Sequence, residues 1–361
     1  MTVSQGRPEQ MARWHGPRGS LVLGVLVGLL LLSLMMGVWI GSVGIHPLAL
    51  FGVVWNALPF ADVDPWWRAT DSQILVGIRL PRVIGAAAVG VALSTAGVLF
   101  QGLLRNPLAD PFVIGSSGGA ALGAAAGSLL LSLNIAFLGF GIVPLLGFVG
   151  SFVTVWIVYI LSRHHGRTSI SGLILAGFAL GSVAGALNAL LVILSDQLQI
   201  RFMQTISWIL GGVSVNGWAP IASVVPLVVV GVVAGFLLTA RLDALALGER
   251  GATRVGVDVE RTKLAVIATA SLLTALAVSL SGLVAFVGLL VPHAVRMIIG
   301  PNNRLLLPAA ALAGGSFLIV ADLLARTLLA PVEVPVGIFT AIVGSPVFVL
   351  LLRRARGSYD F

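Results

Sequence analysis

The sequence predicts an all-α membrane protein with about ten transmembrane helices. Only 9% of the 361 residues are charged and 58% are hydrophobic, whereas a soluble domain carries roughly 25% charged residues. Apolar runs of about 20 residues recur along the chain, and each is long enough to cross a hydrocarbon core of roughly 30 Å. These runs lack the alternation of a barrel strand, so the predicted spans are helices.

The elements follow in order from a polar N-terminal tail, 1–20. The first span, 21–40, has no small-residue cleavage site after it, so we expect a retained helix rather than a removed signal peptide. A loop is expected at 41–73, and a C-terminal tail at 353–361. The single transmembrane domain, 21–352, is completed by spans at 81–103, 113–133, 136–161, 171–194, 219–240, 264–280, 282–300, 305–329 and 336–352.

The distribution of basic residues predicts that both termini are cytoplasmic. With ten spans, 16 of the 21 Arg and Lys residues fall in inside loops and ends, and five fall outside. This is the bias expected of cytoplasmic loops. Arg79, Arg82 and Arg326 lie at outer span ends against the bias. They either bind an acidic partner outside the membrane or extend to the interface as ordinary amphipathic side chains.

The segment 242–263, LDALALGERGATRVGVDVERTK, is the longest charged run between apolar segments. It must lie outside the bilayer, because a charge at the bilayer centre costs at least about 2.5–3.5 kcal/mol. Its helical spacing is interrupted at Gly248, Gly251 and Gly256, which predicts two short surface helices. The segment is either a solvated connection or a cytoplasmic docking platform for a soluble partner.

Motifs for catalysis are weak. The chain has no GxxxxGK[ST] phosphate loop, its one lysine is Lys263 and it has no cysteine, so it is not expected to hydrolyse nucleotides or to use thiolate chemistry. Residues 115–118, GSSG, fit the GxSG pattern of intramembrane serine proteases. A hydrolase acting through Ser117 would need a facing histidine, for which His293 is the nearest candidate.

Three further polar groups have both a functional and a structural interpretation. The pair His164-His165 is more readily a solvated turn than a metal site, since no carboxylate lies nearby in sequence. Asp322 could serve an ion-coupled secondary transporter, but an ion pair with Arg326 at i,i+4 is favoured. Thr168 and Ser169 form a small polar turn at a span mouth, where they suit a constriction that opens and closes, a helix cap, or both.

Several segments together resemble one family, the FecCD permeases of ABC importers for iron–siderophore complexes, haem and vitamin B12. The matching segments run in family order over roughly 75–352 and are RLPR (79–82), QGLLRNPLADP (101–111), LGE (247–249) with Ala252 and Gly256, GLVAFVGLLVPHAVR (282–296), ADLLAR (321–326), VPVG (334–337) and GSP (344–346).

This resemblance implies a type II ABC importer permease fold that works by alternating access. It implies two ATP-binding cassette ATPase subunits inside, a substrate-binding protein outside and a second permease subunit, with a homodimer favoured, in the bacterial cytoplasmic (inner) membrane. No catalytic residue, cofactor, metal or nucleic acid is expected. A ferric siderophore is the favoured cargo, and haem or cobalamin are the alternatives.

The resemblance also assigns roles to individual positions. It places binding-protein docking at Arg79, Arg82 and Arg326, and the cytoplasmic gate at Thr168 and Ser169. It places ATPase coupling within 242–263, at Leu245, Leu247, Gly248, Glu249, Ala252 and Gly256.

Overall fold

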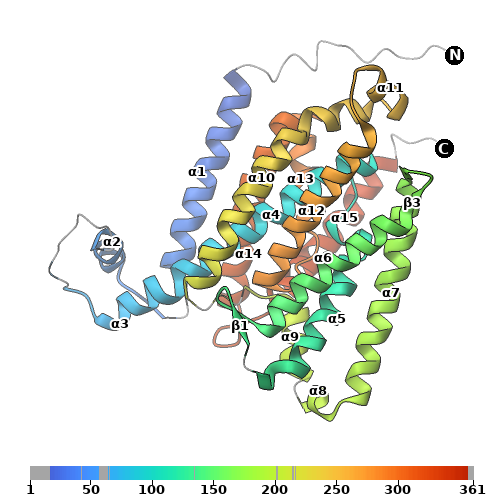
Figure 1. Cartoon of the computed structure of the whole chain (residues 1–361). Helices are drawn as coiled ribbons and strands as arrows, with labels where there is room; N and C mark the ends of the chain where they lie inside the picture. The colour runs from blue at the N-terminus through green and yellow to red at the C-terminus, as the bar shows by residue number, and fades with distance from the viewer. Residues whose placement is uncertain are drawn as a thin grey trace.

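The computed structural model describes residues 17–41, 43–56, 64, 66–133, 135–200, 202–213, 215 and 217–356. It is a bundle of helices with two short hairpins, and its long helices lie where spans are predicted (Figure 1). The described residues include seven helices long and apolar enough to cross a membrane. These are α1 (Pro17–Trp39), the continuous helix Ala69–Leu104 that contains α4, α6 (Ile142–Ser162), α7 (Ile170–Leu194), α10 (Ala219–Ala246), α12 (Val259–Ser281) and α14 (Asn303–Thr327).

The other three predicted positions are occupied by α5 (Ser116–Leu129), α13 (Val287–Ile299) and α15 (Val336–Arg356). The ten predicted spans therefore all correspond to helices. The termini of the chain at 1–16 and 357–361, which hold most of the two predicted tails, lie outside the described residues.

Helix α4 (Leu80–Leu104) forms the centre of the bundle and packs against α10, α12, α13 and α14. Two of its glycines let neighbouring backbones approach closely. A Cβ on Gly90 would lie 2.1 Å from the carbonyl oxygen of Gly314, and one on Gly97 would lie 1.8 Å from that of Gly288. Helices α13 and α14 therefore contact α4 at a distance that no side chain would permit.

A second group consists of α5, α6 and α7, with α5 packed against both of the others. The residues 115–118 lie where α5 begins, next to α7. A Cβ on Gly115 would lie 2.6 Å from the carbonyl oxygen of Gly177, and one on Gly118 would lie 2.7 Å from that of Gly181. The small residues of this run are thus explained by close helix packing.

The predicted loop 41–73 is wrong in part. It contains a short helix, α2 (Pro47–Asn56), and the long central helix already begins in it, as α3 (Ala69–Ser72) followed by a π-helical stretch, η3 (Gln73–Arg79). Pro81, at the start of α4, has no N–H to donate to the preceding turn. The wide π turns come directly before it, so the helix continues past the proline instead of starting there.

The prediction of two short helices in 242–263 is also wrong. Helix α10 continues to Ala246, one short helix, α11 (Glu249–Arg254), follows, and α12 begins at Val259. The breaks fall at Gly248 and Gly256, whose φ angles are +94° and +84°, a conformation that favours glycine. Gly251 lies inside α11, where a glycine weakens a helix without ending it.

The remaining elements are short. Two hairpins are formed by β1 (Ala136–Phe137) with β2 (Phe140–Gly141), and by β3 (Arg163–His164) with β4 (Arg167–Thr168). Short helices η4 (Pro111–Ile114), η5 (Leu130–Leu133), α8 (Asp196–Ile200) and α9 (Phe202–Ile209) complete the described chain.

Different elements lie at the two ends of the bundle (Figure 1). Helix α11, the β3–β4 hairpin, the start of α1 and the end of α15 lie at one end, which we call the α11 end (Figure 1). The end of α1 and the start of the helix that contains α4 lie at the other, which we call the arginine end (Figure 1). An even number of spans requires the start of the first helix and the end of the last helix to lie on the same side. The start of α1 and the end of α15 both lie at the α11 end (Figure 1).

Candidate functional site

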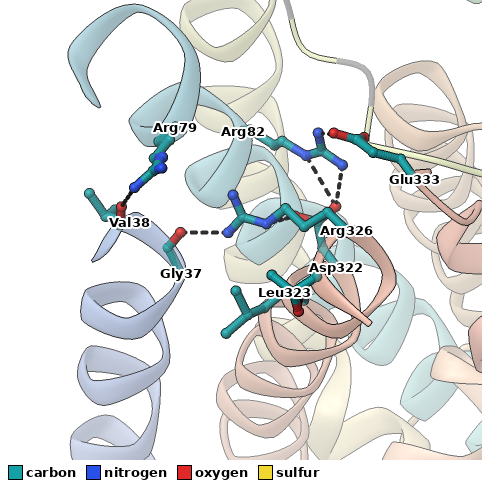
Figure 2. Close-up of polar contacts among 9 residues, drawn as sticks. Gly37, Val38, Arg79, Arg82, Asp322, Leu323, Arg326 and Glu333 are labelled. Atoms are coloured by element: carbon teal, nitrogen blue, oxygen red, sulfur yellow. Dashed lines mark hydrogen bonds and ion pairs between the residues drawn. The ribbon is translucent and has the colours of Figure 1, made fainter. Parts of the chain in front are cut away.

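At the arginine end, two buried arginines bind the last carbonyl groups of α1 (Figure 2). Arg79, only 4% exposed, donates hydrogen bonds to the carbonyl oxygens of Val38 (3.1 Å), Trp39 (2.8 Å) and Val43. Arg326, 5% exposed, donates to the carbonyl oxygen of Gly37. The last carbonyls of a helix have no partner within the helix and carry partial negative charge, so cations stabilise them.

Asp322 connects this cluster to α4. Its carboxylate is buried and accepts hydrogen bonds from Arg82, at 3.0 Å from Nη2 and 3.2 Å from Nε. Arg326 lies one helical turn away, with its Nε 3.6 Å from the other carboxylate oxygen. The ion pair predicted between Asp322 and Arg326 is confirmed, and Arg82 is a second partner, closer to the carboxylate, that the sequence spacing did not indicate.

Arg82 is the one of the three outer arginines whose side chain reaches the surface. The side chain is 20% exposed, and its Nη1 lies 3.0 Å from Oε2 of Glu333, which is 53% exposed. A cavity of about 420 Å³ opens beside this pair, with Trp208, Ile78 and Pro335 among its lining residues. A group entering the cavity can therefore approach Arg82, whereas Arg79 and Arg326 face the interior.

At the α11 end, the six positions proposed for ATPase coupling divide into anchors and surface residues. Leu245 and Ala252 are buried, at 2% and 0% exposure, and hold the segment on the bundle. Leu247 is 69% exposed and Glu249 is also exposed. Gly248 and Gly256 lie at the turns on either side of α11. The turn before α11 and the start of α11 thus present one apolar and one acidic side chain to the outside, on a segment anchored by two buried residues.

The β3–β4 hairpin carries the two predicted gate residues. Ser169 caps α7, since its hydroxyl oxygen accepts a hydrogen bond from the backbone N–H of Gly172 at 3.1 Å, as the capping interpretation predicted. Thr168 is buried, and its backbone N–H donates to Oε2 of Glu260 at 2.8 Å. His164 and His165 are exposed around the turn of the hairpin, as expected of a solvated turn.

Lys263 joins these two features. Its ammonium group lies 2.8 Å from Oε1 of Glu249 on α11 and 2.9 Å from Oε1 of Glu260 on α12. It also donates a 2.8 Å hydrogen bond to the carbonyl oxygen of Thr168. From the sequence alone, Lys263 was relevant only to the absence of a phosphate loop. The sequence signal available for one of these contacts was Glu260, three residues before Lys263 on α12.

Two of the segments that carry the family resemblance contact each other inside the bundle. Nε2 of Gln101 donates to the carbonyl oxygen of Leu289 at 3.1 Å, and Nη2 of Arg296 donates to Oε1 of Gln101 at 3.3 Å. Asp110 accepts backbone N–H bonds from Phe112 and Phe286. Burial raises the pKa of Asp110 to about 6, although both hydrogen bonds act to lower it.

Among the described residues, no hydrogen bond joins Ser117 of the GSSG run to His293. The hydroxyl of Ser116 is buried and donates to the carbonyl oxygen of Pro111 at 3.3 Å. Nδ1 of His293 is buried and makes no hydrogen bond among the described residues. Gly115 and Gly118 of this run serve close packing against α7.

The fold and its charged ends define an integral membrane permease of the type II ABC importer class. A solved metal-chelate type ABC transporter in an inward-facing conformation is similar to this chain, with a TM-score of 0.78 and 29% identity over 93% of this chain and 99% of that one. The FecCD transport family matches residues 29–354, and the chain belongs to this family.

Curated relatives agree with this assignment. The chain is 39% identical to the ABC transporter permease protein YvrB of Bacillus subtilis, over 91% of this chain and 92% of the relative. It is 40% identical to the cobalamin import system permease protein BtuC of Halobacterium salinarum, over 85% and 81%. It is 38% identical to the hemin transport system permease protein HmuU of Yersinia pestis, over 92% and 96%. The family is one of transport permeases rather than of enzymes.

Proposed function

We propose that this chain is the permease subunit of an ATP-driven importer that moves a ferric siderophore across the cytoplasmic membrane by alternating access, with haem or cobalamin as the alternative cargoes. The observation that carries the proposal is membership of the FecCD family over residues 29–354. The names of relatives include cobalamin, hemin and Fe(3+) dicitrate systems. The siderophore is placed first because iron–siderophore permeases are the largest group that the sequence resembles.

The α11 end supports docking of two ATPase subunits, one on each permease of a dimer. Helix α11 is held by buried Leu245 and Ala252 while Leu247 and Glu249 face outward. An exposed apolar residue, Leu247, directly before a short helix that carries an exposed acidic residue suits insertion into a groove of a soluble partner. ATP binding would close the ATPases and move α11, while the permease itself supplies no chemistry.

The arginine end supports docking of a substrate-binding protein. Arg82 lies at the cavity beside Glu333, and a carboxylate of the binding protein could replace Glu333 as its partner. Arg79 and Arg326 would act by shaping this end, because their guanidinium groups hold the carbonyls of α1. The two proposed docking surfaces therefore lie at opposite ends of one bundle, as an importer requires.

The second permease is proposed to be a copy of the same chain. Helix α7 is long and apolar, yet only 11% of its most apolar 18-residue stretch is buried inside the protein. A face of this kind is covered either by lipid or by another subunit. The absence of native cysteine makes the test direct: cysteines introduced at Phe178 and Leu187, both exposed on α7, should cross-link two copies if α7 lies at the dimer interface.

The test of the proposed function is uptake by proteoliposomes that contain the permease, its ATPase and its binding protein. Labelled ferric siderophore, haem and cobalamin are offered in parallel. ATP-dependent uptake of one cargo, lost when the binding protein is omitted, is the expected result and identifies the cargo. Uptake of none of the three would contradict the proposal.

A further inference from the structure

Lys263 is the only lysine of the chain and its side chain is 3% exposed. Lysine is almost never fully buried without a partner, and near a membrane surface it normally extends its ammonium group into water. Here the ammonium group instead turns into the protein and is surrounded by two carboxylates and a carbonyl oxygen, each within 3 Å.

The contacts of Glu260 and Lys263 with Thr168 fix the hairpin to α12. Glu260 accepts a hydrogen bond from the backbone N–H of Thr168 at 2.8 Å, and Lys263 donates one to the backbone carbonyl of the same residue at 2.8 Å. Glu260 and Lys263 also bind each other at 2.9 Å. Both backbone groups of Thr168, the residue before Ser169, are therefore held by one ion pair on α12.

The third contact extends the network to α11. Glu249 is the first residue of α11, and its carboxylate lies 2.8 Å from the ammonium group of Lys263. Displacement of α11 would act on Lys263 through this ion pair. Since Lys263 binds the Thr168 carbonyl directly, the movement would reach the hairpin through a single side chain.

We infer that Lys263 is a positioning residue that transmits movement of α11 to the β3–β4 hairpin. The inference rests on the proposed function, because it assumes that α11 receives the movement of an ATPase and that the hairpin forms the gate. It adds a physical connection between these two parts. Coupling through a two-state element of this kind typically changes an equilibrium by about 5- to 150-fold.

The test uses four single variants and one double variant in proteoliposomes with the ATPase and the binding protein, and measures cargo transported per ATP hydrolysed. Lys263→Met removes the charge and keeps an unbranched side chain, whereas Lys263→Arg keeps a cation in reach of both carboxylates. Glu249→Ala removes the α11 contact and leaves Lys263 with Glu260 and Thr168. Arg261→Met is the matched control, because Arg261 is 86% exposed and its one ion pair with a described residue is with Asp258, three positions before it.

Lys263→Met and Glu249→Ala should each lower transport per ATP by about tenfold, while Lys263→Arg and Arg261→Met stay within about twofold. The double variant, Lys263→Met with Glu249→Ala, should lose no more than either single variant, because each single variant already breaks the connection between α11 and the hairpin. Independent effects would instead multiply to about a hundredfold. That outcome would mean that Glu249 acts separately, for instance on the ATPase, and would overturn the inference.

A second readout follows the hairpin itself. A nitroxide on Arg167→Cys, at an exposed position of β4, should change its spectrum on ATP binding in the otherwise unaltered protein and in Arg261→Met, but not in Glu249→Ala. Glu249→Ala therefore tests the connection even where Lys263→Met does not fold. Normal transport and a normal spectral response in Glu249→Ala and Lys263→Met would overturn the inference alone. Absence of any ATP-driven uptake in the unaltered protein would overturn the proposed function and the inference with it.

Discussion

Arg82 and Asp322 lie 240 positions apart in the sequence, and two hydrogen bonds of 3.0 and 3.2 Å join the guanidinium group of one to a single carboxylate oxygen of the other. The contact fixes the start of α4 against the end of α14 at the arginine end of the bundle. It also gives a buried carboxylate the partner that it needs, because an unpaired buried charge is strongly unfavourable.

The first prediction concerns the stability of this pair. Asp322→Leu removes the carboxylate, which leaves the buried Arg326 without its counter-ion and Arg82 with only the exposed Glu333, so the free energy of unfolding should fall by about 3–5 kcal/mol. Thermal or denaturant unfolding in detergent micelles measures this. The control is Glu333→Gln, which alters an exposed partner of Arg82 and should change stability by less than about 1 kcal/mol. Equal stability of both variants would contradict the assigned role.

The second prediction concerns which of the three outer arginines contacts the substrate-binding protein. Arg82→Gln should weaken binding of the substrate-binding protein by about tenfold or more, because it removes the cation that faces the cavity. Arg68→Gln, at an exposed position of the same end, should have little effect. Binding is measured by surface plasmon resonance on permease in nanodiscs, and equal affinities of the two variants would exclude docking at Arg82.

Glu333 provides the complementary change. If a carboxylate of the binding protein replaces Glu333 beside Arg82, then Glu333→Gln removes the competing charge and should strengthen docking by about threefold to tenfold. Weaker docking would mean that Glu333 itself contacts the partner.

In contrast to both changes, Arg79→Gln should lower the unfolding temperature, because the carbonyls of Val38 and Trp39 lose their donor.

The third prediction tests the close packing of α4. Gly97→Ala places a Cβ 1.8 Å from the carbonyl oxygen of Gly288, so α13 must move, and stability should fall by about 3 kcal/mol or more. Gly28→Ala on α1 meets nothing within 4 Å and should be neutral or slightly stabilising. Expression and unfolding temperature distinguish the two, and a stable Gly97→Ala protein would show that α4 and α13 are not held at backbone contact.

The fourth prediction concerns ATPase docking at α11. Leu247→Ser changes a residue that is 69% exposed, so it should reduce co-purification of the ATPase without lowering the unfolding temperature. Val332→Ser is the control, since Val332 is 65% exposed but lies between α14 and α15, near Glu333. Loss of the ATPase in both variants, or in neither, would contradict docking through α11.

The positions of the helices could be predicted because length and hydropathy determine them. Runs such as 171–194 and 305–329 are long and apolar, and they correspond to α7 and α14 within a few residues. The start of the helix that contains α4 could not be predicted, because Pro81 normally marks a helix start and the π turns of η3 have no sequence signal of their own. The single helix α11 depends on which glycines adopt positive φ, a choice made by packing.

The sequence indicated which residues are candidates for the site, but it did not indicate most of the contacts between them. An acid four residues before an arginine indicated the pair Asp322–Arg326, but no local pattern shows that Arg82 approaches the same carboxylate from another helix. The burial of Arg79 and Arg326 was likewise hidden, because their partners are backbone carbonyls of α1, which carry no sequence signature.

The central claim is that ATPase subunits drive transport through this chain, and one comparison tests it most directly. Cargo uptake is measured in proteoliposomes with the complete complex, with and without ATP, and again with the permease and binding protein but no ATPase. The account predicts accumulation only in the complete complex with ATP. Equal accumulation without the ATPase, driven by an imposed proton or sodium gradient, would contradict it and would make Asp322 the first residue to investigate as an ion-coupling site.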